Sequence, residues 1–117
     1  MSPHTQRAYR KEAERLILWS IVERGKPLSS LTTEDAVAYR AFLRQPTPRA
    51  RWVGTSRPRS SPEWRPFAGA LSSRSLAHAL SVLGALFRWL IEQRYVLANP
   101  FAGIKVIDMA LGLLGLA

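Results

Sequence analysis

The segment from Leu71 to Phe101 constrains the fold most, because it reads as one long helix with apolar residues on two sides. At helical spacing, its apolar positions fall into two adjacent stripes. The first stripe consists of Leu76, Leu80, Leu83, Phe87 and Leu90, and the second of Val82, Leu86 and Trp89. A helix of this kind has to pack against several neighbours. The sequence therefore predicts a central helix within a helical bundle.

The ends and the remaining face of this helix are also marked. Ser72 or Ser73 can cap its first turn, and the helix should end near residues 93–97, because Asn99-Pro100 forces a turn. The face outside both stripes carries Arg74, His78, Ser81, Ala85, Arg88 and Glu92. Small residues and positive charge on this face indicate a surface that a bulky partner can approach.

Two further helices are expected before the central one. The first should run from a Ser2 cap and Pro3 to about residues 24–25. Its expected buried stripe is Tyr9, Ala13, Leu16, Ile17 and Ile21, flanked by Trp19 or Val22. The second should cover Thr33 to Arg44, with threonine at its cap, carboxylates in its first turn and Pro46 just beyond its end.

Positive charge gathers in the first half of the first helix, at Arg7, Arg10 and Lys11. These cations lie toward the positive end of the helix dipole, which is slightly unfavourable and suggests a purpose other than stability. An ordinary solvated face is the alternative, because Arg10 and Glu14 are spaced as an i,i+4 ion pair.

The residues from Gln45 to Ser72 are expected to form a long loop rich in proline and arginine. A connection of this length inside a compact domain is usually either functional or disordered. It carries a net charge of +4, from Glu63 and the arginines Arg49, Arg51, Arg57, Arg59 and Arg65. Rings at Trp64 and Phe67 should pin it to the bundle, and Ser61-Pro62-Glu63 can open a short helical turn. The arginines are predicted to bind phosphate, and a flexible solvated loop is the alternative.

Composition limits the classes of function. The 117 residues suffice for one domain, and the formal net charge is +9, with a sequence pI near 11.3. Fourteen of the 17 basic residues are arginine, which favours phosphate recognition, so nucleic acid is the leading partner over an anionic membrane surface or an acidic protein. The absence of cysteine excludes thiol nucleophiles and cysteine-based zinc sites. We find no signal peptide or membrane-spanning run in the sequence and expect a soluble, cytoplasmic protein without cofactor or metal.

The ordered combination of these features resembles a known family. Ser2-x-x-Thr5-x-x-x-Tyr9 opens the first helix, Leu31-Thr32-Thr33-Glu34-Asp35 precedes Tyr39 and Leu43, and Leu80-Ser81-x-Leu83-x-x-Leu86-Phe87-x-Trp89-Leu90 is followed by Asn99-Pro100. The order and spacing resemble the N-terminal core-binding domain of tyrosine recombinases, the phage-integrase family. The resemblance covers residues 2–105 except the loop at 45–72, which looks like an insertion.

The resemblance implies an all-α, SAM-like orthogonal bundle of four to five helices that forms one half of a clamp around double-stranded DNA. Residues 1–105 would be this domain, and residues 106–117 an apolar tail or the start of a linker to a catalytic domain. On the long helix the implied DNA contacts are Ser73, Arg74, Ala77, His78 and Ser81, and on the first helix Thr5, Arg7, Arg10 and Lys11. Many relatives have arginine at the position of His78, so a simply solvated histidine remains the alternative there.

Catalysis is not expected from this chain. The family's tyrosine nucleophile lies in a C-terminal domain, and too few residues follow Lys105 to contain it. The three tyrosines fall inside the helical pattern and are interpreted as packing residues. The resemblance therefore implies a DNA-binding module of bacterial or phage origin, whose full-length parent carries out recombination as a multimer on DNA.

The sequence leaves one alternative function open and disfavours another. A helical protein-interaction module could self-associate or dock a partner through the apolar residues 108–117, with the basic loop keeping it soluble. A helix-turn-helix regulator is disfavoured, because that motif needs a short turn between its two helices.

Overall fold

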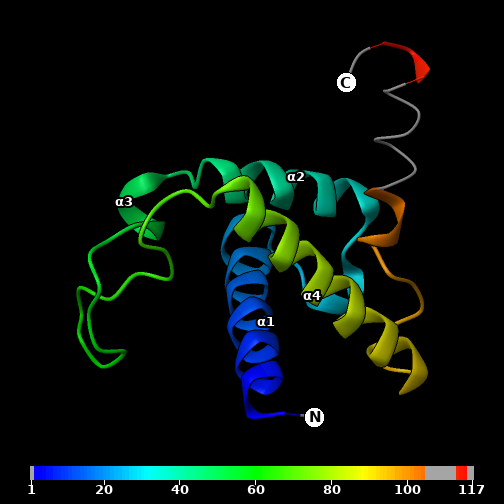
Figure 1. Cartoon of the computed structure of the whole chain (residues 1–117), viewed down its shortest axis with the longest axis horizontal. Coiled ribbons are helices and arrows are strands. Elements are labelled where there is room, and N and C mark those ends of the chain that lie inside the picture. The colour runs from blue at the N-terminus through cyan, green and yellow to red at the C-terminus, as the bar shows by residue number, and fades with distance from the viewer. Residues whose placement is uncertain (1, 105–112, 116–117) are drawn as a thin grey trace.

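The computed structural model describes residues 2–104 and 113–115. Its helices are α1 (Pro3–Arg24), the 3-10 helix η1 (Leu28–Ser30), α2 (Thr33–Arg44), α3 (Arg49–Trp52) and α4 (Ser73–Glu92). Helix α4 packs against both α1 and α2, and Figure 1 shows α2 running across the end of α1. Within the described ranges no strand forms, and Val53 and Phe67 make a single isolated bridge. The predicted all-α bundle, with its long connection between α2 and α4, is confirmed.

Capping interactions lie at the helix starts that the sequence predicted, and at the predicted end of α1. The Ser2 hydroxyl accepts a hydrogen bond from the Thr5 amide at the start of α1, and the Ser72 hydroxyl accepts one from the Ser75 amide at the start of α4. Gly25 ends α1 in the left-handed conformation, at φ 64°, and its amide donates to the carbonyl of Ile21. These bonds satisfy backbone groups that the helix itself leaves unpaired.

A buried carboxylate joins α1 to α2. Asp35 is fully buried and forms a capping box with Thr32, and it also pairs with Arg24 and Lys26 at 2.8 Å each. Burial alone would raise the pKa of Asp35, but hydrogen bonds from Lys26, Thr32 and Arg24 outweigh it and hold that pKa well below its usual range. The end of α1 is thereby fixed to the beginning of α2.

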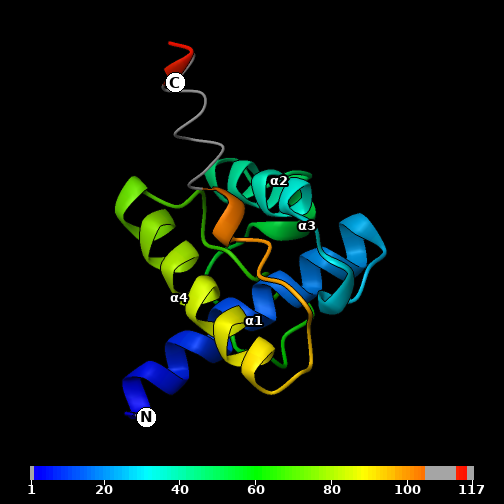
Figure 2. The same ribbon diagram turned by 90° about the vertical axis from the view of Figure 1, so that its right-hand side faces the viewer.

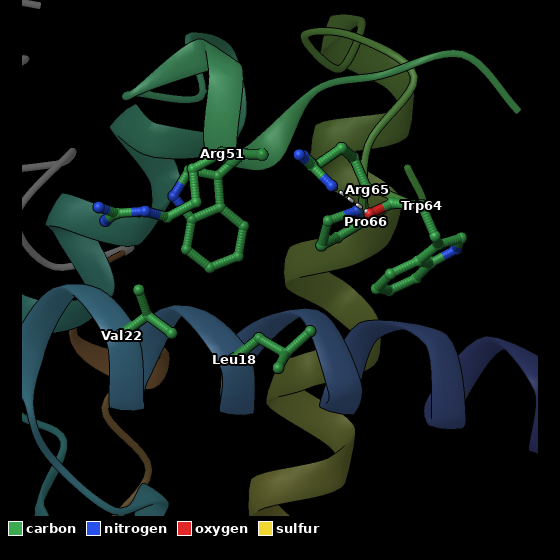
Figure 3. Close-up of a pocket in the computed structure, with 7 residues that line it drawn as sticks. Leu18, Val22, Arg51, Trp64, Arg65 and Pro66 are labelled. Atoms are coloured by element: carbon green, nitrogen blue, oxygen red, sulfur yellow. Dashed lines mark hydrogen bonds between the residues drawn. The ribbon is translucent and has the colours of Figure 1, made fainter. Parts of the chain in front are cut away.

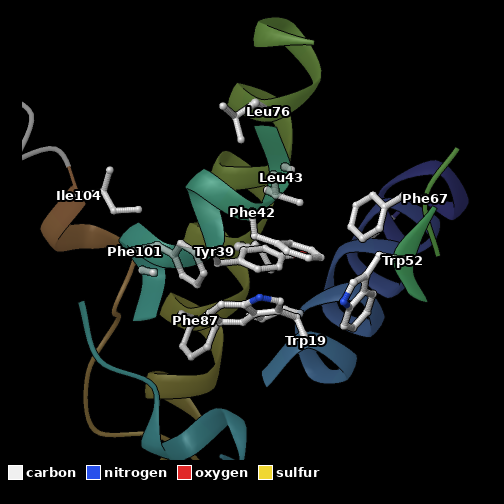
Figure 4. Close-up of a cluster of buried hydrophobic side chains, with 14 of the residues drawn as sticks. Trp19, Tyr39, Phe42, Leu43, Trp52, Phe67, Leu76, Phe87, Phe101 and Ile104 are labelled. Carbon is white, nitrogen blue, oxygen red and sulfur yellow. The ribbon is translucent and has the colours of Figure 1, made fainter. Parts of the chain in front are cut away.

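The hydrophobic core is built largely from aromatic rings (Figure 4). Trp19 of α1 lies 5.0 Å from Tyr39 of α2, between ring centroids, and Phe87 of α4 lies 5.6 Å from Phe101. The remaining fully or nearly buried hydrophobic residues are Leu16, Ala36, Phe42, Leu43, Trp52, Phe67, Leu76, Ala79, Val82, Leu83, Val96 and Ile104. Every helix except η1 contributes to this core, so the central role predicted for the long helix is confirmed.

Helix α1 is rotated from its expected orientation. The predicted stripe included Ile17 and Ile21, but these are 39% and 59% exposed, whereas Glu12, Leu16, Trp19 and Ser20 are buried. The rotation places the large Trp19 ring against Tyr39, which buries more apolar surface than either isoleucine would. Trp89, expected in a buried stripe of α4, is 51% exposed for a similar reason, because Phe87 and Leu83 face the core instead.

The chain after α4 folds back onto the bundle through Asn99-Pro100. The side-chain Nδ2 of Asn99 donates to the Gly84 carbonyl in the middle of α4 at 3.1 Å, while its side-chain oxygen accepts from the backbone amide of Phe101. Gly103 then lies so close to Thr33 that a Cβ atom would come within 2.8 Å of that side chain. Helix α4 itself ends earlier, at Glu92, where Arg94 takes the left-handed conformation at φ 59° and the Tyr95 amide donates to the Leu90 carbonyl. The Asn-Pro pair directs residues 101–104 against the start of α2. The predicted boundary at 105/106 lies outside the described residues.

Among the described residues, α4 alone is long and apolar enough to cross a membrane by length and composition. Its apolar side chains Leu76, Ala79, Leu83 and Phe87 are buried in the core, and the central helix of a bundle passes the same test.

The Asp35 arrangement predicts a specific dependence of stability on pH. Because the pKa of Asp35 is lowered in the folded state, its contribution is complete above the unfolded value of about 4 and is lost as the pH falls below it. Asp35→Asn should lower the free energy of unfolding at pH 7 by about 2 kcal/mol and reduce its decline between pH 5 and pH 2. Urea unfolding across this range measures both effects. Glu34→Gln, on an exposed neighbour, is the control, and equal pH profiles for the two variants would contradict the assignment.

Candidate nucleic-acid interface

The connection between α2 and α4 is packed against the bundle. Its two ends pair with each other, because the Phe67 amide donates to the Trp52 carbonyl and the Gly54 amide to the Phe67 carbonyl, at 3.0 Å each. The rings of Trp52 and Phe67 both pack edge-on against Phe42 of α2, at centroid distances of 5.2 Å and 5.6 Å. Of the two rings predicted to pin the connection, Phe67 is buried in the core, whereas Trp64 is only half-buried and lines two hollows beside α1. The second ring that anchors the connection in the core is Trp52.

Local structure in the connection differs from the expectation in two places. A short helix, α3, forms at Arg49–Trp52, where a loop was expected. The predicted helical turn at 61–63 is a hydrogen-bonded turn, in which the Trp64 amide donates to the Ser61 carbonyl. The α3 turn brings Trp52 into the core, which explains why helix forms there despite the flanking prolines.

Four of the five arginines in the connection are held by the protein itself. Arg51 pairs with Glu23 at 2.7 Å, Arg57 pairs with Glu63 at 3.1 Å, and Arg59 pairs with Glu14. Arg65 donates to three backbone carbonyls, those of Ala50, Pro62 and Trp64. Arg49 is exposed, and its side chain has no ion pair or hydrogen bond within the described part of the chain. These arginines therefore hold the connection in place as well as giving it charge.

Glu23 of α1 ties α3 to the bundle. Its Oε1 atom accepts hydrogen bonds from the Trp52 indole at 2.8 Å and from Arg51 at 2.7 Å. The Trp52 hydrogen bond contributes most to lowering the pKa of Glu23, and Arg51 adds to it, while burial acts in the opposite direction. The carboxylate thus remains charged where it holds Trp52.

An apolar hollow separates α1 from the connection (Figure 3). Its volume is about 300 Å³, and Leu18 and Val22 of α1 point toward the connection, with Val22 below Arg51 and Leu18 nearer Pro66. Arg51 and Arg65 lie at its edge, with both guanidinium groups already bonded as described above. This hollow offers an apolar surface and no free cation.

A second hollow, of about 220 Å³, is strongly basic. We call it the basic hollow; it is lined by Arg7, Arg10, Lys11, Glu14, Arg15, Arg59, Trp64 and Pro66. Arg7, Arg10 and Lys11 come from the exposed first half of α1, and Arg59 reaches in from the connection. Five cations surround a single carboxylate, so the hollow attracts anions.

The wall of the basic hollow is preorganised. Arg15 donates twice to the Pro66 carbonyl, at 3.3 Å, and its guanidinium stands 4.3 Å from the centre of the Phe67 ring. The Arg59 guanidinium lies 4.9 Å from the centre of the Trp64 ring. Arg15 and Arg59 are thus held in place by the connection, through the rings of Phe67 and Trp64 and the carbonyl of Pro66.

The predicted contact residues of α4 form an exposed surface at its start. Ser73, Arg74, Ala77, His78 and Ser81 are all exposed, while Leu76, Ala79 and Leu83 face the core. The sides of the helix follow from its periodicity, which puts these five positions on the outward half. Figure 2 shows the first turns of α1 and of α4 along the left edge of the view, with the start of α1 at the bottom and the start of α4 well above it.

The structure thus brings some predicted site residues together and separates others. Arg7, Arg10, Lys11 and Arg59 share the basic hollow, whereas Arg49, Arg51, Arg57 and Arg65 do not line it. Thr5 is half-buried and bonds the Ser2 hydroxyl, so it serves the helix cap. Sequence reasoning missed Arg15, Glu14 and Trp64 as lining residues; the i+4 and i+8 spacing of Arg7, Lys11 and Arg15 was the available signal.

Comparison of the chain with protein-family models, with curated proteins and with solved structures finds no match. Within residues 2–104 and 113–115, no group of three or more histidine, cysteine or carboxylate side chains is placed to hold a metal ion. A function for the chain is therefore proposed from the basic hollow and the exposed start of α4.

The different roles of the arginines predict different effects on stability. Arg65→Ala should lower the free energy of unfolding by about 1 kcal/mol, since three carbonyls lose their donor. Arg49→Ala should change it by less than about 0.5 kcal/mol. Thermal and urea unfolding of the two variants measure this difference, and equal losses would contradict the structural role of Arg65.

Proposed function

We propose that this chain is the DNA-binding module of a site-specific tyrosine recombinase of the phage-integrase type, acting in the cytoplasm. It would hold double-stranded DNA while a separate C-terminal catalytic domain carries out the recombination. The observation that carries this proposal is the basic hollow between α1 and the pinned connection, together with the exposed start of α4, which carries Arg74, His78 and Ser81.

The two surfaces suit different parts of a duplex. Arg7, Arg10 and Lys11 are exposed cations that can contact the phosphate backbone, which sets position and affinity but carries no sequence information. On α4, the small residues Ala77 and Ser81 allow close approach of the helix, and Arg74 and His78 can donate to base edges in the major groove. Affinity would thus come mainly from α1 and the hollow, and sequence preference from α4.

The alternative function, a protein-interaction module that docks through residues 108–117, concerns a segment that lies mostly outside the described residues. Leu113 and Leu114, which are described, are exposed. This alternative predicts self-association that disappears when residues 108–117 are removed, without DNA binding.

Fluorescence anisotropy with random duplex DNA across a salt series tests the proposal. The logarithm of the binding constant should fall linearly with the logarithm of salt concentration, by about 0.9 per phosphate contact. Arg7→Ala/Arg10→Ala should reduce this slope by about 2 and weaken binding to every sequence equally. Arg74→Ala should instead reduce the preference among sequences once a target site has been selected.

The matched control is Arg44→Ala/Arg94→Ala, which removes the same charge from exposed positions outside the hollow and outside the α4 surface. It should lower the slope by much less than the α1 variant does. Equal effects of both variants would mean that net charge alone drives binding. No binding at low salt would exclude the recombinase proposal and favour the protein-interaction alternative.

A further inference from the structure

Glu14 occupies an unexpected place in the basic hollow. It is the single carboxylate among five cations, and it forms an ion pair with Arg59 across 45 residues of sequence. Its side chain is 28% exposed and that of Arg59 is 62% exposed, so solvent and solutes reach the pair. An exposed pair of this kind contributes little to stability.

The surroundings of the pair favour another anion. Arg7, Arg10 and Lys11 line the same hollow, and no ion pair from any of them to a carboxylate is present in the described residues. Arg59 also keeps its position over the Trp64 ring, a contact that does not depend on Glu14. A phosphate that entered the hollow would find the oriented guanidinium groups of Arg15 and Arg59 and three exposed cations, and Glu14 is the lining carboxylate that would repel it.

We propose that the basic hollow is a phosphate-binding site for the DNA backbone, and that Glu14 occupies Arg59 until a backbone phosphate replaces it. This inference rests on the proposed function and adds to it a defined site with a built-in competitor. Binding proceeds by exchange of ion pairs: Arg59 releases the Glu14 carboxylate and takes up a phosphate oxygen, and no covalent bond changes. The connection thereby contributes Arg59 to the DNA contact, while Arg51, Arg57 and Arg65 are bonded within the protein.

The exchange has an unusual consequence. Removing most carboxylates from a protein changes DNA binding only through net charge, but removing Glu14 also frees a cation that is already positioned. Glu14→Gln should therefore tighten binding to random duplex DNA by about three- to tenfold at moderate salt and should steepen the salt slope by about 1. Arg59→Ala should weaken binding, and in the Arg59→Ala background the Glu14→Gln change should lose most of its effect.

Glu34→Gln is the control, because it makes the same change of charge at an exposed position on α2 outside the hollow. It should tighten binding much less than Glu14→Gln. Thermal unfolding of each variant confirms that the fold is retained, as expected for an exposed pair. Equal effects of Glu14→Gln and Glu34→Gln, or an undiminished effect of Glu14→Gln without Arg59, would overturn the exchange while leaving DNA binding itself established.

Two further outcomes separate the sources of phosphate and the two proposals. Calorimetric titration with inorganic phosphate should show no binding below millimolar concentration, since one free phosphate engages only part of the hollow. Tight binding of free phosphate that DNA cannot displace would assign the hollow to a small anion and overturn the inference. If neither the natural chain nor Glu14→Gln binds DNA at low salt, the proposed function fails, and the inference fails with it.

Discussion

The contact of Phe42 with Trp52 and Phe67 is the interaction on which the functional surface depends. These edge-on ring contacts, 5.2 and 5.6 Å between centroids, hold both ends of a long polar connection against α2. Ordering such a connection costs conformational entropy for every residue, and the ordering has to be offset by buried apolar area. The two rings supply that area, and Arg15 extends the anchoring to α1 through Phe67 and the Pro66 carbonyl. Without these anchors Arg59 and Trp64 would not form a wall of the basic hollow.

Positive charge in this chain therefore has two physical roles. Arg24 and Lys26 neutralise the buried Asp35, and Arg51 and Arg65 satisfy Glu23 and backbone carbonyls, so these cations stabilise the fold. Within the described residues, the cations at the start of α1 form no ion pair with a carboxylate, although they lie at the unfavourable end of the helix dipole. A high net charge alone does not distinguish the two groups, whereas the positions of the carboxylates within residues 2–104 do.

The elements that could be predicted from the sequence are those fixed by local interactions. The start of α1 at Ser2 and Pro3, the bounds of α2 and the cap of α4 at Ser72 follow from contacts between residues three or four apart. The rotation of α1 could not be predicted, because Ile17 and Trp19 compete for the core and only the position of Tyr39 decides between them. The ion-pair partners of the arginines in the connection could not be predicted either. Arg51 and Arg59 meet carboxylates 28 and 45 residues away, and no local pattern encodes those partners.

The outward side of α1 carries two kinds of surface, one cationic and one apolar. Helical periodicity puts Arg7, Arg10, Ile17 and Ile21 on the same half of the helix, away from Leu16 and Trp19. The surface is thus cationic over the first turns and apolar over the last ones, where Ile21 is 59% exposed. A phosphate backbone gains nothing from the apolar end, so under the proposed function a duplex would contact α1 over its first turns, before Ile17. The exposed apolar side chains at this end, Ile17, Ile21 and Val22, form instead a surface suited to contact with another protein.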